Sequence, residues 1–398
     1  MSTHAQLRPI PVDDRAWLLP ALADALKGGS PILPVAPGLG GDEVQRLQAA
    51  ELPAGTAVVV RTSGSSGVPK AVALSAEALI ASAEAAHEAL GGPGQWLVTL
   101  PAHLISGLQM LVRSQMSGID PVFFDGSFDP AALLEAAERM EHERRYVSLV
   151  PVQLARLLDL AQADPAAAEA LRGFAGVLVG GQATSLSLRQ RAHELDVNLR
   201  RSYGMTETSG GCVYDGVEIG DTRMRIRGGE VQLSGSCLAT SYVGGDEDAA
   251  GALQLTHDRF IDDAGTRWYR TGDAGELLGG MLTVSGRLDR VIISGGVNVS
   301  LDEVERVVRE LPGWSSAVAL GAPHPEWGER ASLVVETEAG AIPLDEVKTA
   351  VKQQLGAAAV PEWATETTQL PRLAGGKPDM QQIERWIAEL RQSFRQTR

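Results

Sequence analysis

Short apolar segments alternate with helix-like segments through most of the first 200 residues, and this alternation limits the fold more than any other feature. The apolar segments are typical of buried strands: TAVVV (56–60), QWLVTL (95–100), DPVFF (120–124), YVSLV (146–150) and GVLVGG (176–181). The segments 75–90, 130–145 and 151–161 between them are typical of helices. Strand–helix alternation predicts parallel sheets covered by helices, so the predicted class is α/β.

The pattern changes twice further along the chain, which indicates a subdomain and a second domain. Short strands with glycine turns between residues 224 and 284 predict a β-rich subdomain. A smaller α+β unit follows, with predicted strands in 291–296, 316–321 and 332–337 and predicted helices at 301–311 and 344–355. A chain of 398 residues is long enough for two domains. We therefore predict a large N-terminal domain, residues 1–288, and a small mobile C-terminal domain, residues 289–398.

The composition argues against several classes of protein. A formal charge of −15 argues against nucleic-acid binding, which requires basic surfaces. The two cysteines, Cys212 and Cys237, are too few for a disulfide framework, lack metal-ligand spacing and indicate a reducing compartment. We see neither a signal peptide nor an apolar stretch long enough to span a membrane. We therefore expect a cytoplasmic protein whose partners are small molecules, with no membrane insertion and with a homodimer left open.

The segment RTSGSSGVPK (61–70) follows the first predicted strand directly and combines glycines, hydroxyls and one lysine. Glycines let a backbone approach an anion closely, and successive N–H groups and hydroxyls can donate hydrogen bonds to it. Gly/Ser segments are also common in ordinary turns and linkers. The Walker pattern requires Gly-Lys-Ser/Thr, whereas here Pro69 precedes Lys70 and Ala71 follows it. The segment is therefore either a different kind of phosphate loop or an ordinary turn.

Four further motifs place chemical groups in or near turns: RSYGMTETSGG (201–211), YRTGD (269–273), GRLDRVIISGG (286–296) and GGK (375–377). Each motif alone has an ordinary structural explanation, such as a core ring for Tyr203, a turn for Asp273 or a solvated charge for Lys377. Together and in this order, the motifs resemble the adenylate-forming superfamily of acyl-CoA synthetases, nonribosomal-peptide adenylation domains and luciferases. The resemblance extends from about Thr56 to Lys377.

Within this superfamily the sequence is most similar to the o-succinylbenzoate–CoA ligase family of actinobacterial menaquinone (vitamin K2) biosynthesis. The segments PAHLISGLQMLVRS (101–114) and YGMTETSGGCVYDG (203–216) carry this narrower resemblance. It implies an ATP-dependent acid–thiol ligase that converts o-succinylbenzoate to o-succinylbenzoyl-CoA through an acyl-adenylate. ATP, Mg²⁺ and coenzyme A would be its cofactors and co-substrates. An acyl-CoA synthetase for another aryl or aliphatic acid remains the alternative.

The resemblance also implies which residues bind ATP. The loop that holds the β- and γ-phosphates corresponds to Thr62, Ser63, Gly64, Ser65, Ser66, Gly67 and Lys70. Tyr203 corresponds to the aromatic residue that lies against adenine. Gly181 and Gln182 correspond to the strand end that lines the base, although the family usually has small residues in place of Gln182.

The resemblance assigns the reacting centre to a second group of residues. Thr206 corresponds to the residue that contacts the α-phosphate, and Glu207 to the carboxylate that holds Mg²⁺. Asp273 corresponds to the acid that binds the ribose hydroxyls, with Arg287 as its cationic partner. Lys377 corresponds to the lysine that reaches the carboxylate and the α-phosphate. The family often has an arginine three residues later, where this chain has Met380.

The remaining assignments concern the acid and the thiol. His103 corresponds to a gate between the acyl pocket and the thiol channel, with Ser106, Gly107, Ser209 and Gly210 as further substrate contacts. Arg113 is the candidate for binding the aromatic carboxylate, with a structural ion pair as the alternative explanation. Asp289 corresponds to the hinge about which the C-terminal domain rotates. That rotation would bring Ser294, Gly295 and Gly296 to the thiol channel. A catalytically inactive homologue is disfavoured because Lys70, Glu207, Asp273 and Lys377 are all present.

Overall fold

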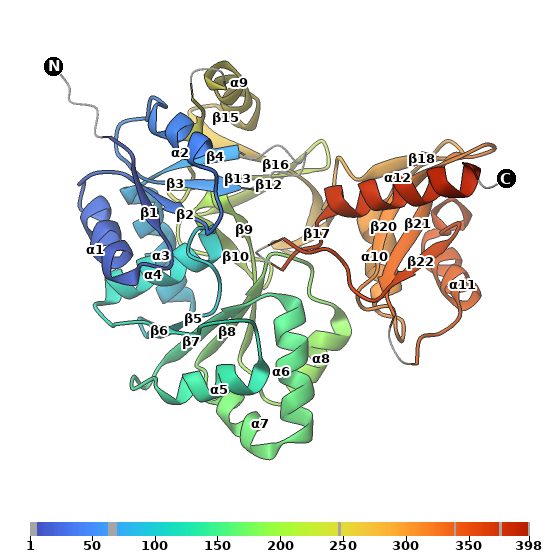
Figure 1. Cartoon of the computed structure of the whole chain (residues 1–398), viewed down its shortest axis with the longest axis horizontal. Coiled ribbons are helices and arrows are strands. Elements are labelled where there is room, and N and C mark those ends of the chain that lie inside the picture. The colour runs from blue at the N-terminus through green and yellow to red at the C-terminus, as the bar shows by residue number, and fades with distance from the viewer. Residues whose placement is uncertain (1–5, 63–69, 246–247, 338–339, 374–375, 397–398) are drawn as a thin grey trace.

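The computed structural model describes residues 6–62, 70–245, 248–337, 340–373 and 376–396. The strands of this part form four sheets, and helices lie on or between them (Figure 1). Three sheets belong to residues 8–287 and the fourth to residues 291–367. The predicted α/β class is confirmed, and the predicted boundary at 288/289 falls between the third sheet and the fourth.

The first sheet brackets the predicted phosphate loop. Its order is β1-β2-β3-β4-β14, made of Arg8–Pro11, Ile32–Val35, Thr56–Thr62, Lys70–Ser75 and Ser241–Val243. Strands β3 and β4 are antiparallel, and Thr62 pairs with Lys70 at their open end. Residues 63–69 therefore join the ends of two adjacent strands. The sequence predicted β3 but not β4, which is a short strand between the loop and the following helix.

The second sheet is mostly parallel, as the alternating pattern predicts. Its order is β11-β10-β9-β8-β7-β5-β6, made of Val217–Glu218, Gly210–Tyr214, Leu199–Met205, Gly176–Gly180, Arg145–Leu149, Gln95–Val98 and Val122–Phe123. Strands β9, β8, β7, β5 and β6 are parallel to one another, whereas β10 is antiparallel to both β9 and β11. The carboxyl ends of the parallel strands therefore meet at one edge, where α/β proteins bind ligands.

The helices of the N-terminal domain before residue 200 pack on the first two sheets. They are α1 (Arg15–Leu26), α2 (Gly41–Gln48), α3 (Ala76–Ala89), α4 (Ile105–Ser117), α5 (Pro130–Glu138), α6 (Pro151–Ala163), α7 (Pro165–Arg172) and α8 (Leu186–Glu194). One core joins α1, α3 and α4 to the first sheet and to one face of the second sheet. A second core joins α5, α6 and α7 to the opposite face. The N-terminal domain is thus layered, with α3 and α4 between two sheets.

The third and fourth sheets complete the chain. The third contains β12 (Arg223–Arg227), β13 (Glu230–Ser234), β15 (Phe260–Asp263), β16 (Thr266–Leu278) and β17 (Met281–Arg287), with α9 (Ala249–Arg259) beside it. The fourth contains β18 (Val291–Ser294), β19 (Val297–Ser300), β20 (Val318–His324), β21 (Gly328–Glu336) and β22 (Ala364–Thr367). The remaining helices, α10 (Leu301–Arg309), α11 (Leu344–Leu355) and α12 (Met380–Gln396), lie with the fourth sheet (Figure 1).

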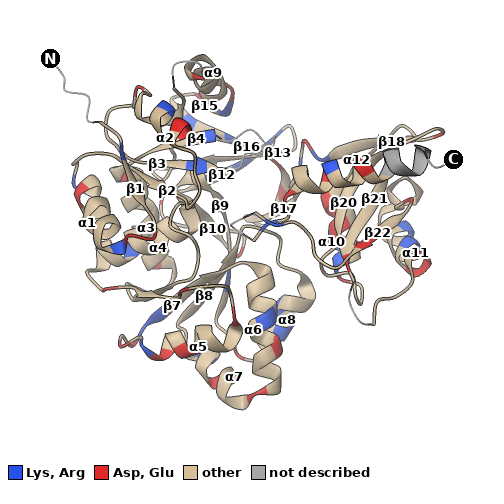
Figure 2. Cartoon of the chain, in the orientation of Figure 1, with Lys and Arg blue, Asp and Glu red and all other residues tan. Residues whose placement is uncertain are grey.

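Some local predictions need correction. The helix predicted over 130–145 ends at Glu138, and Arg145 begins β7. Helix α9 interrupts the segment that was predicted to be β-rich. Among the described residues, none of the helices combines the length and the apolar character that a membrane span requires. Figure 2 shows acidic and basic residues interspersed over both domains in this view, so the negative charge is not gathered on one face there.

Candidate functional site

The predicted site residues gather where parallel strands end and the C-terminal domain approaches. Val150 follows β7, Gly181 follows β8 and Thr206 follows β9. Lys377 reaches the same edge from the connection between β22 and α12. A Cβ atom built on Gly181 would lie 3.4 Å from Lys377 Cε, and one built on Gly376 would lie 3.2 Å from Val150 Cγ2. The C-terminal domain therefore places Lys377 directly against the strand ends.

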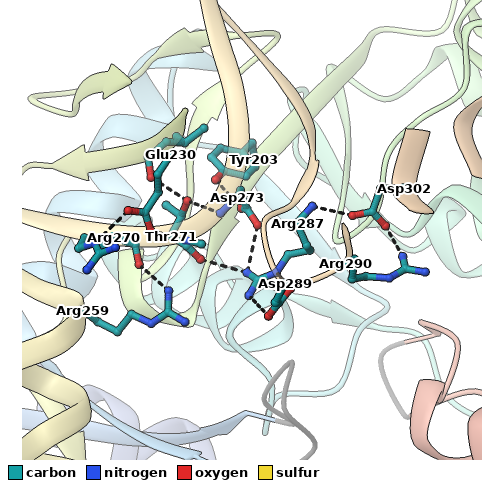
Figure 3. Close-up of polar contacts among 12 residues, drawn as sticks. Tyr203, Glu230, Arg259, Arg270, Thr271, Asp273, Arg287, Asp289, Arg290 and Asp302 are labelled. Carbon is teal, nitrogen blue, oxygen red and sulfur yellow. Dashed lines mark hydrogen bonds and ion pairs between the residues drawn. The ribbon is translucent and has the colours of Figure 1, made fainter. Parts of the chain in front are cut away.

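Asp273 and Arg287 face each other across the β16–β17 hairpin. The register pairs these two residues, and Arg287 Nη1 donates to Asp273 Oδ1 at 3.1 Å. The hydroxyl of Tyr203, on β9, donates to the other carboxylate oxygen at 2.6 Å (Figure 3). Asp273 is buried, and its backbone N–H donates a hydrogen bond to the Thr271 hydroxyl. Three elements thus fix this carboxylate beside the Tyr203 ring.

The charges in this cluster favour an ionised pair. Burial disfavours the charge of Arg287, but hydrogen bonds and charges from Asp289 and Asp273 outweigh it and raise the pKa of Arg287. Burial and the adjacent Asp273 charge raise the pKa of Tyr203 well above its ordinary value. Tyr203 therefore remains a neutral donor, because its hydroxyl proton is shared with an acceptor that carries negative charge.

Glu207 lies in the short 3₁₀ turn Thr206–Thr208 and is buried. The Tyr242 hydroxyl, from β14, donates to Glu207 Oε1 at 2.7 Å, and the Tyr269 hydroxyl lies 3.3 Å from that of Tyr242. Burial and the Glu207 charge raise the pKa of Tyr242, which keeps this hydroxyl a donor. The two tyrosines therefore fix the direction of the Glu207 carboxylate.

Two lysines lie near these carboxylates. Lys70 Nζ is 5.9 Å from the centre of the Tyr242 ring, and burial lowers the pKa of Lys70. Part of the Lys377 side chain is accessible to solvent, yet the surrounding protein desolvates its ammonium group. This desolvation lowers the pKa of Lys377, while the charge of Asp273 opposes the shift. The site thus holds cations from both domains.

The described part of the phosphate loop consists of its two ends. Thr62 and Lys70 pair at the end of the β3–β4 ladder. The predicted phosphate contacts Ser63, Gly64, Ser65, Ser66 and Gly67 lie outside the described residues. Gln182, the residue that departs from the family pattern, is half-buried and directly follows Gly181, whose φ is +82°.

The predicted acyl-side residues lie around the start of α4 and the turn after Thr208. His103 is half-buried, and burial followed by the Arg61 charge lowers its pKa. Ser106 is exposed in the first turn of α4. Gly107 has a packing reason of its own, since a Cβ there would lie 2.2 Å from the Pro101 carbonyl oxygen. A larger residue at 107 would push α4 away from this segment.

Ser209 and Gly210 form a turn that contacts α3 and α4. Ser209 has a φ of +51°, and its carbonyl accepts a hydrogen bond from the Ser82 hydroxyl on α3. Its own hydroxyl donates to the Cys237 carbonyl at 2.8 Å. A Cβ on Gly210 would lie 3.1 Å from Cγ of Gln109 on α4. Ser209 is fully buried, so this structure uses it to hold the turn.

Arg113 lies one turn beyond Gln109 on α4 and is buried. Its Cζ is 4.7 Å from the centre of the Trp96 ring, and Nη2 is 3.5 Å from the Tyr214 hydroxyl. Its Nε has no hydrogen-bond partner, and no carboxylate among the described residues forms an ion pair with it. The alternative explanation of Arg113 as one half of a structural ion pair is therefore not observed in the described part of the chain.

The structure does not bring every predicted residue to one place. Ser294, Gly295 and Gly296 lie in the β18–β19 hairpin of the C-terminal domain, away from the Lys377 connection (Figure 1). The Gly295 N–H donates to the Trp327 carbonyl, and a Cβ on Gly295 would lie 2.6 Å from the Trp327 ring. Asp289 instead lies beside the site, where it accepts from Arg287 at 2.9 Å (Figure 3).

Sequence reasoning missed the residues that orient the predicted ones. Tyr269 stands in YRTGD, so its place in the motif could have indicated it. Tyr242 lies more than 30 positions from Glu207 in an ordinary strand, and no local signal points to their hydrogen bond. Tyr214 stands near the end of the YGMTETSGGCVYDG segment, but only the fold places its hydroxyl next to Arg113.

The chemistry of the site suits a phosphorylated nucleoside. The buried carboxylates of Glu207 and Asp273 are each held by hydrogen bonds, and Lys70 and Lys377 offer positive charge to phosphate oxygens. Across the described residues, no three His, Cys, Asp or Glu side chains converge to hold a metal ion. Mg²⁺ bound mainly by phosphates and water needs only one or two carboxylates. The buried and oriented Glu207 fits that requirement.

Comparison with known proteins also indicates a nucleotide-binding enzyme, and the matches cover most of the chain. The family described as "AMP-binding enzyme" matches residues 15–233, and "AMP-binding enzyme C-terminal domain" matches residues 303–377. A Mycobacterium tuberculosis protein named "Probable 2-succinylbenzoate--CoA ligase" is 36% identical over 382 residues, which cover 94% of this chain and 96% of the relative. The 2-succinylbenzoate–CoA ligase of Escherichia coli is 29% identical over 330 residues, covering 82% and 68% respectively.

A solved structure is similar in fold and in sequence. The o-succinylbenzoate coenzyme A synthetase from Bacillus subtilis, in complex with AMP, superimposes with a TM-score of 0.68 and 28% identity. The match covers 81% of this chain and 68% of that one. The sheets described above are thus those of a known two-domain architecture.

Proposed function

Because the chain belongs to the family of AMP-binding enzymes, we propose that it is an AMP-forming acid–thiol ligase of menaquinone biosynthesis that joins 2-succinylbenzoate to coenzyme A. In the first half-reaction a carboxylate oxygen attacks the α-phosphorus of ATP, and pyrophosphate leaves. In the second, the thiol sulfur of coenzyme A attacks the acyl carbon, and AMP leaves. The adenylate is needed because a free carboxylate has only oxide as a leaving group.

The observation that carries the choice of acid is the environment of Arg113. 2-Succinylbenzoate has two carboxylates, and activation of the succinyl one leaves the aromatic one to be recognised. Arg113 is a buried guanidinium without a carboxylate partner among the described residues. A buried cation is costly unless an anion meets it, and guanidinium–carboxylate hydrogen bonds are strong. A dicarboxylic acid therefore suits this environment better than benzoate or a fatty acid.

We propose that the residues around Arg113 enclose the rest of the acid. Ser209 and Gly210 would form one wall, because their turn contacts Gln109 on the same helix as Arg113. His103, Ser106 and Gly107 would form the entrance, with His103 between the acyl pocket and the thiol path. The backbone of Gly107 allows this entrance to approach the 100–101 segment closely.

For ATP, the proposed roles follow the cluster at the strand ends. Asp273 and Arg287 would bind the ribose, and Tyr203, whose hydroxyl is tied to Asp273, would present its ring to adenine beside Gly181 and Gln182. Thr206 would contact the α-phosphate. Glu207 would hold Mg²⁺, which when bound neutralises phosphate charge. The segment from Thr62 to Lys70 would enclose the β- and γ-phosphates.

We further propose that the domain boundary at 288/289 is a hinge. In the present orientation Lys377 lies against Gly181, where it can neutralise charge as the carboxylate attacks the α-phosphate. Rotation about Asp289 would withdraw Lys377 and bring Ser294, Gly295 and Gly296 to the thiol path. We place the enzyme in the cytoplasm, because ATP and coenzyme A are its co-substrates.

The test is a panel of acids assayed for AMP and thioester formation with ATP, Mg²⁺ and coenzyme A. We expect 2-succinylbenzoate to have the highest kcat/KM, well above those of benzoate and octanoate. A far higher kcat/KM for either of those acids would overturn the proposed substrate and leave the ligase chemistry standing. Absence of AMP formation with every acid would overturn the ligase itself.

A further inference from the structure

The side chain of Glu310 connects the C-terminal domain to the N-terminus of α8. Glu310 follows the last residue of α10, and its Oε1 accepts from the Leu186 backbone N–H at 2.7 Å. Its Oε2 accepts from the Ser187 N–H at 3.3 Å. The backbone N–H of Leu188, the next residue of the helix, donates to the Ser185 hydroxyl at 3.2 Å. A carboxylate from one domain thus completes the cap of a helix in the other.

This contact has a clear physical basis. The first N–H groups of a helix have no partner within it, and the helix dipole favours negative charge there. Glu310 supplies both an acceptor for two such groups and the negative charge. Glu310, Leu186 and Ser187 are exposed, so water replaces the carboxylate when the domains separate. Such a contact is strong enough to bias an equilibrium and weak enough to break in every cycle.

The same segment also receives Lys377. Gly181 begins the connection from β8 to α8 and lies against Lys377 Cε, while Leu186 and Ser187, the first residues of α8 after that connection, bind Glu310. Two separate parts of the C-terminal domain therefore meet one short segment of the N-terminal domain. A rotation of the C-terminal domain as a rigid body that removes Glu310 from α8 would therefore move Lys377 relative to Gly181 as well.

The two ends of α10 differ in their distance from the proposed hinge. At the start of α10, Asp302 accepts a hydrogen bond from the Arg287 backbone N–H at 2.6 Å. Arg287 is two residues before Asp289, so this contact lies close to the proposed hinge (Figure 3). Glu310 lies eight positions further along the helix, which is about 12 Å at 1.5 Å per residue. Rotation about Asp289 can keep the near contact but must break the far one. The Glu310 contact is therefore specific to the present orientation.

We propose that Glu310 is a positioning residue that holds Lys377 in the site for adenylate formation and releases it for thioester formation. The inference rests on the proposed function, because it divides that reaction into two half-reactions. Glu310 touches neither ATP nor the acid. Its effect passes through the position of the C-terminal domain.

Three variants of the full chain test the contact from both sides. Glu310→Ala removes the acceptor, and Glu310→Gln keeps one carbonyl acceptor but loses the charge. Leu186→Pro removes the first donor, and proline is well tolerated at the first position of a helix. Ser185, which precedes it, has φ −58° and ψ 157°, values that suit a residue before proline. Glu346→Ala, an exposed acid in the first turn of α11, is the matched control.

Two measurements are made on each variant. Hydrogen exchange of the peptide containing Leu186 and Ser187 reports the contact without any catalysis. ATP–pyrophosphate exchange and thioester formation from pre-formed acyl-adenylate report the two half-reactions separately. We expect Glu310→Ala to speed exchange of this peptide and to slow adenylate formation by about two- to fivefold, without slowing thioester formation. Glu310→Gln should be intermediate, and Glu346→Ala should match wild type.

The variant that combines Leu186→Pro with Glu310→Ala completes the test, and three outcomes would count against the account. Leu186→Pro removes only the shorter of the two hydrogen bonds to Glu310, so it should slow adenylate formation by no more than Glu310→Ala does. Combining the two should slow it no further than Glu310→Ala alone, because Glu310→Ala already removes both bonds. If hydrogen exchange of the peptide containing Leu186 and Ser187 is unchanged in Glu310→Ala, the proposal is overturned, whatever the activity of the variant. Faster hydrogen exchange together with an equal loss of both half-reactions also overturns the proposal, because the Glu310 contact then does not favour one domain orientation over the other. A wild type that forms no adenylate contradicts the proposed function, while the exchange result still decides whether Glu310 caps α8.

Discussion

The proposed choice of acid depends on a single side chain, that of Arg113. The sequence places an arginine in an apolar segment, which predicts a buried cation in need of an anion. The structure adds that its neighbours are Trp96 and the Tyr214 hydroxyl, with no acid among the described residues paired to it. The ring and the hydroxyl stabilise the guanidinium only in part, since neither carries a full negative charge.

Replacing Arg113 with leucine should weaken recognition of one end of the substrate. A charge-assisted hydrogen bond contributes about 1.5–3 kcal/mol, so kcat/KM for 2-succinylbenzoate should fall roughly tenfold to a few hundredfold. The KM for ATP should barely change, because Arg113 contacts Trp96 and Tyr214 and neither Asp273 nor Lys70. The control is an analogue without the aromatic carboxylate, with which the variant should lose much less. Equal losses with both acids would make Arg113 a structural residue.

His87, on α3, predicts a pH dependence of stability. Burial, and secondarily the Arg113 charge, lowers the pKa of His87 to about 4, whereas an unfolded histidine titrates near 6.5. Between these two pH values the unfolded chain therefore binds more protons than the folded chain. The contribution of neutral His87 to the unfolding free energy is complete above about pH 6.5 and is lost as pH falls toward 4. From pH 7 to pH 5, wild type should lose more unfolding free energy than His87→Gln, as measured by urea denaturation. His257→Gln, on the exposed side of α9, is the control and should follow wild type; equal pH dependence in His87→Gln would contradict this account.

At the level of single residues, the sequence predicted the chemical groups better than their surroundings. The motifs gave Tyr203, Asp273 and Arg287, and the structure brings these three together through the β16–β17 register and the end of β9. The hydrogen bond from Tyr242 to Glu207 depends instead on β14 joining the first sheet next to β4. Such a pairing between distant segments leaves no periodic or local signal in the sequence.

Helix α4 is the element on which the acyl side of the site depends. It carries Arg113 and Gln109 on its buried face, and its start approaches the 100–101 backbone at Gly107. The sequence did not predict this helix, because its core-facing and site-facing residues leave little polar surface to reveal a helical period. Strands β5, β7 and β8 were predicted, because short β-branched runs that are buried on both faces give a clear signal.

Gly107→Ala should displace α4. Alanine usually stabilises a helix interior by up to about 1 kcal/mol relative to glycine, but here its Cβ would lie 2.2 Å from a backbone oxygen. Overpacking of this kind typically costs about 1–3 kcal/mol. We therefore expect a net loss of unfolding free energy and a raised KM for the acid. Gly41→Ala, in α2 with open space around its Cβ position, should be neutral or stabilising; the same response at both sites would show that the Gly107 contact is unimportant.

For the molecule as a whole, the two domains predict two separable half-reactions. Lys377→Ala should abolish adenylate formation but spare thioester formation from pre-formed acyl-adenylate, because the lysine is needed only in the present orientation. Gly296→Trp should do the reverse, because a bulky side chain would obstruct the thiol path in the other orientation. Rapid-quench measurement of each half-reaction checks both. Equal loss of both half-reactions in Lys377→Ala would contradict the proposed alternation of domains.

The overall layout was predictable and the orientation of the domains was not. Alternating strands and helices, followed by a small α+β unit, predicted the α/β class with a large N-terminal and a small C-terminal domain. The position of Lys377 against Gly181 depends on a few contacts between domains, such as that of Glu310 with α8. Contacts of this size leave no pattern in the sequence, and they are meant to break during the proposed reaction.

The central claim, activation of 2-succinylbenzoate as an adenylate, is tested most directly by ATP–pyrophosphate exchange without coenzyme A. The purified chain is mixed with ATP, Mg²⁺, labelled pyrophosphate and one acid, and the label entering ATP is measured. The account predicts exchange that requires 2-succinylbenzoate, is far weaker with benzoate or octanoate, and disappears in Lys377→Ala. Exchange that is absent with 2-succinylbenzoate, or that proceeds equally well without any acid, would contradict it.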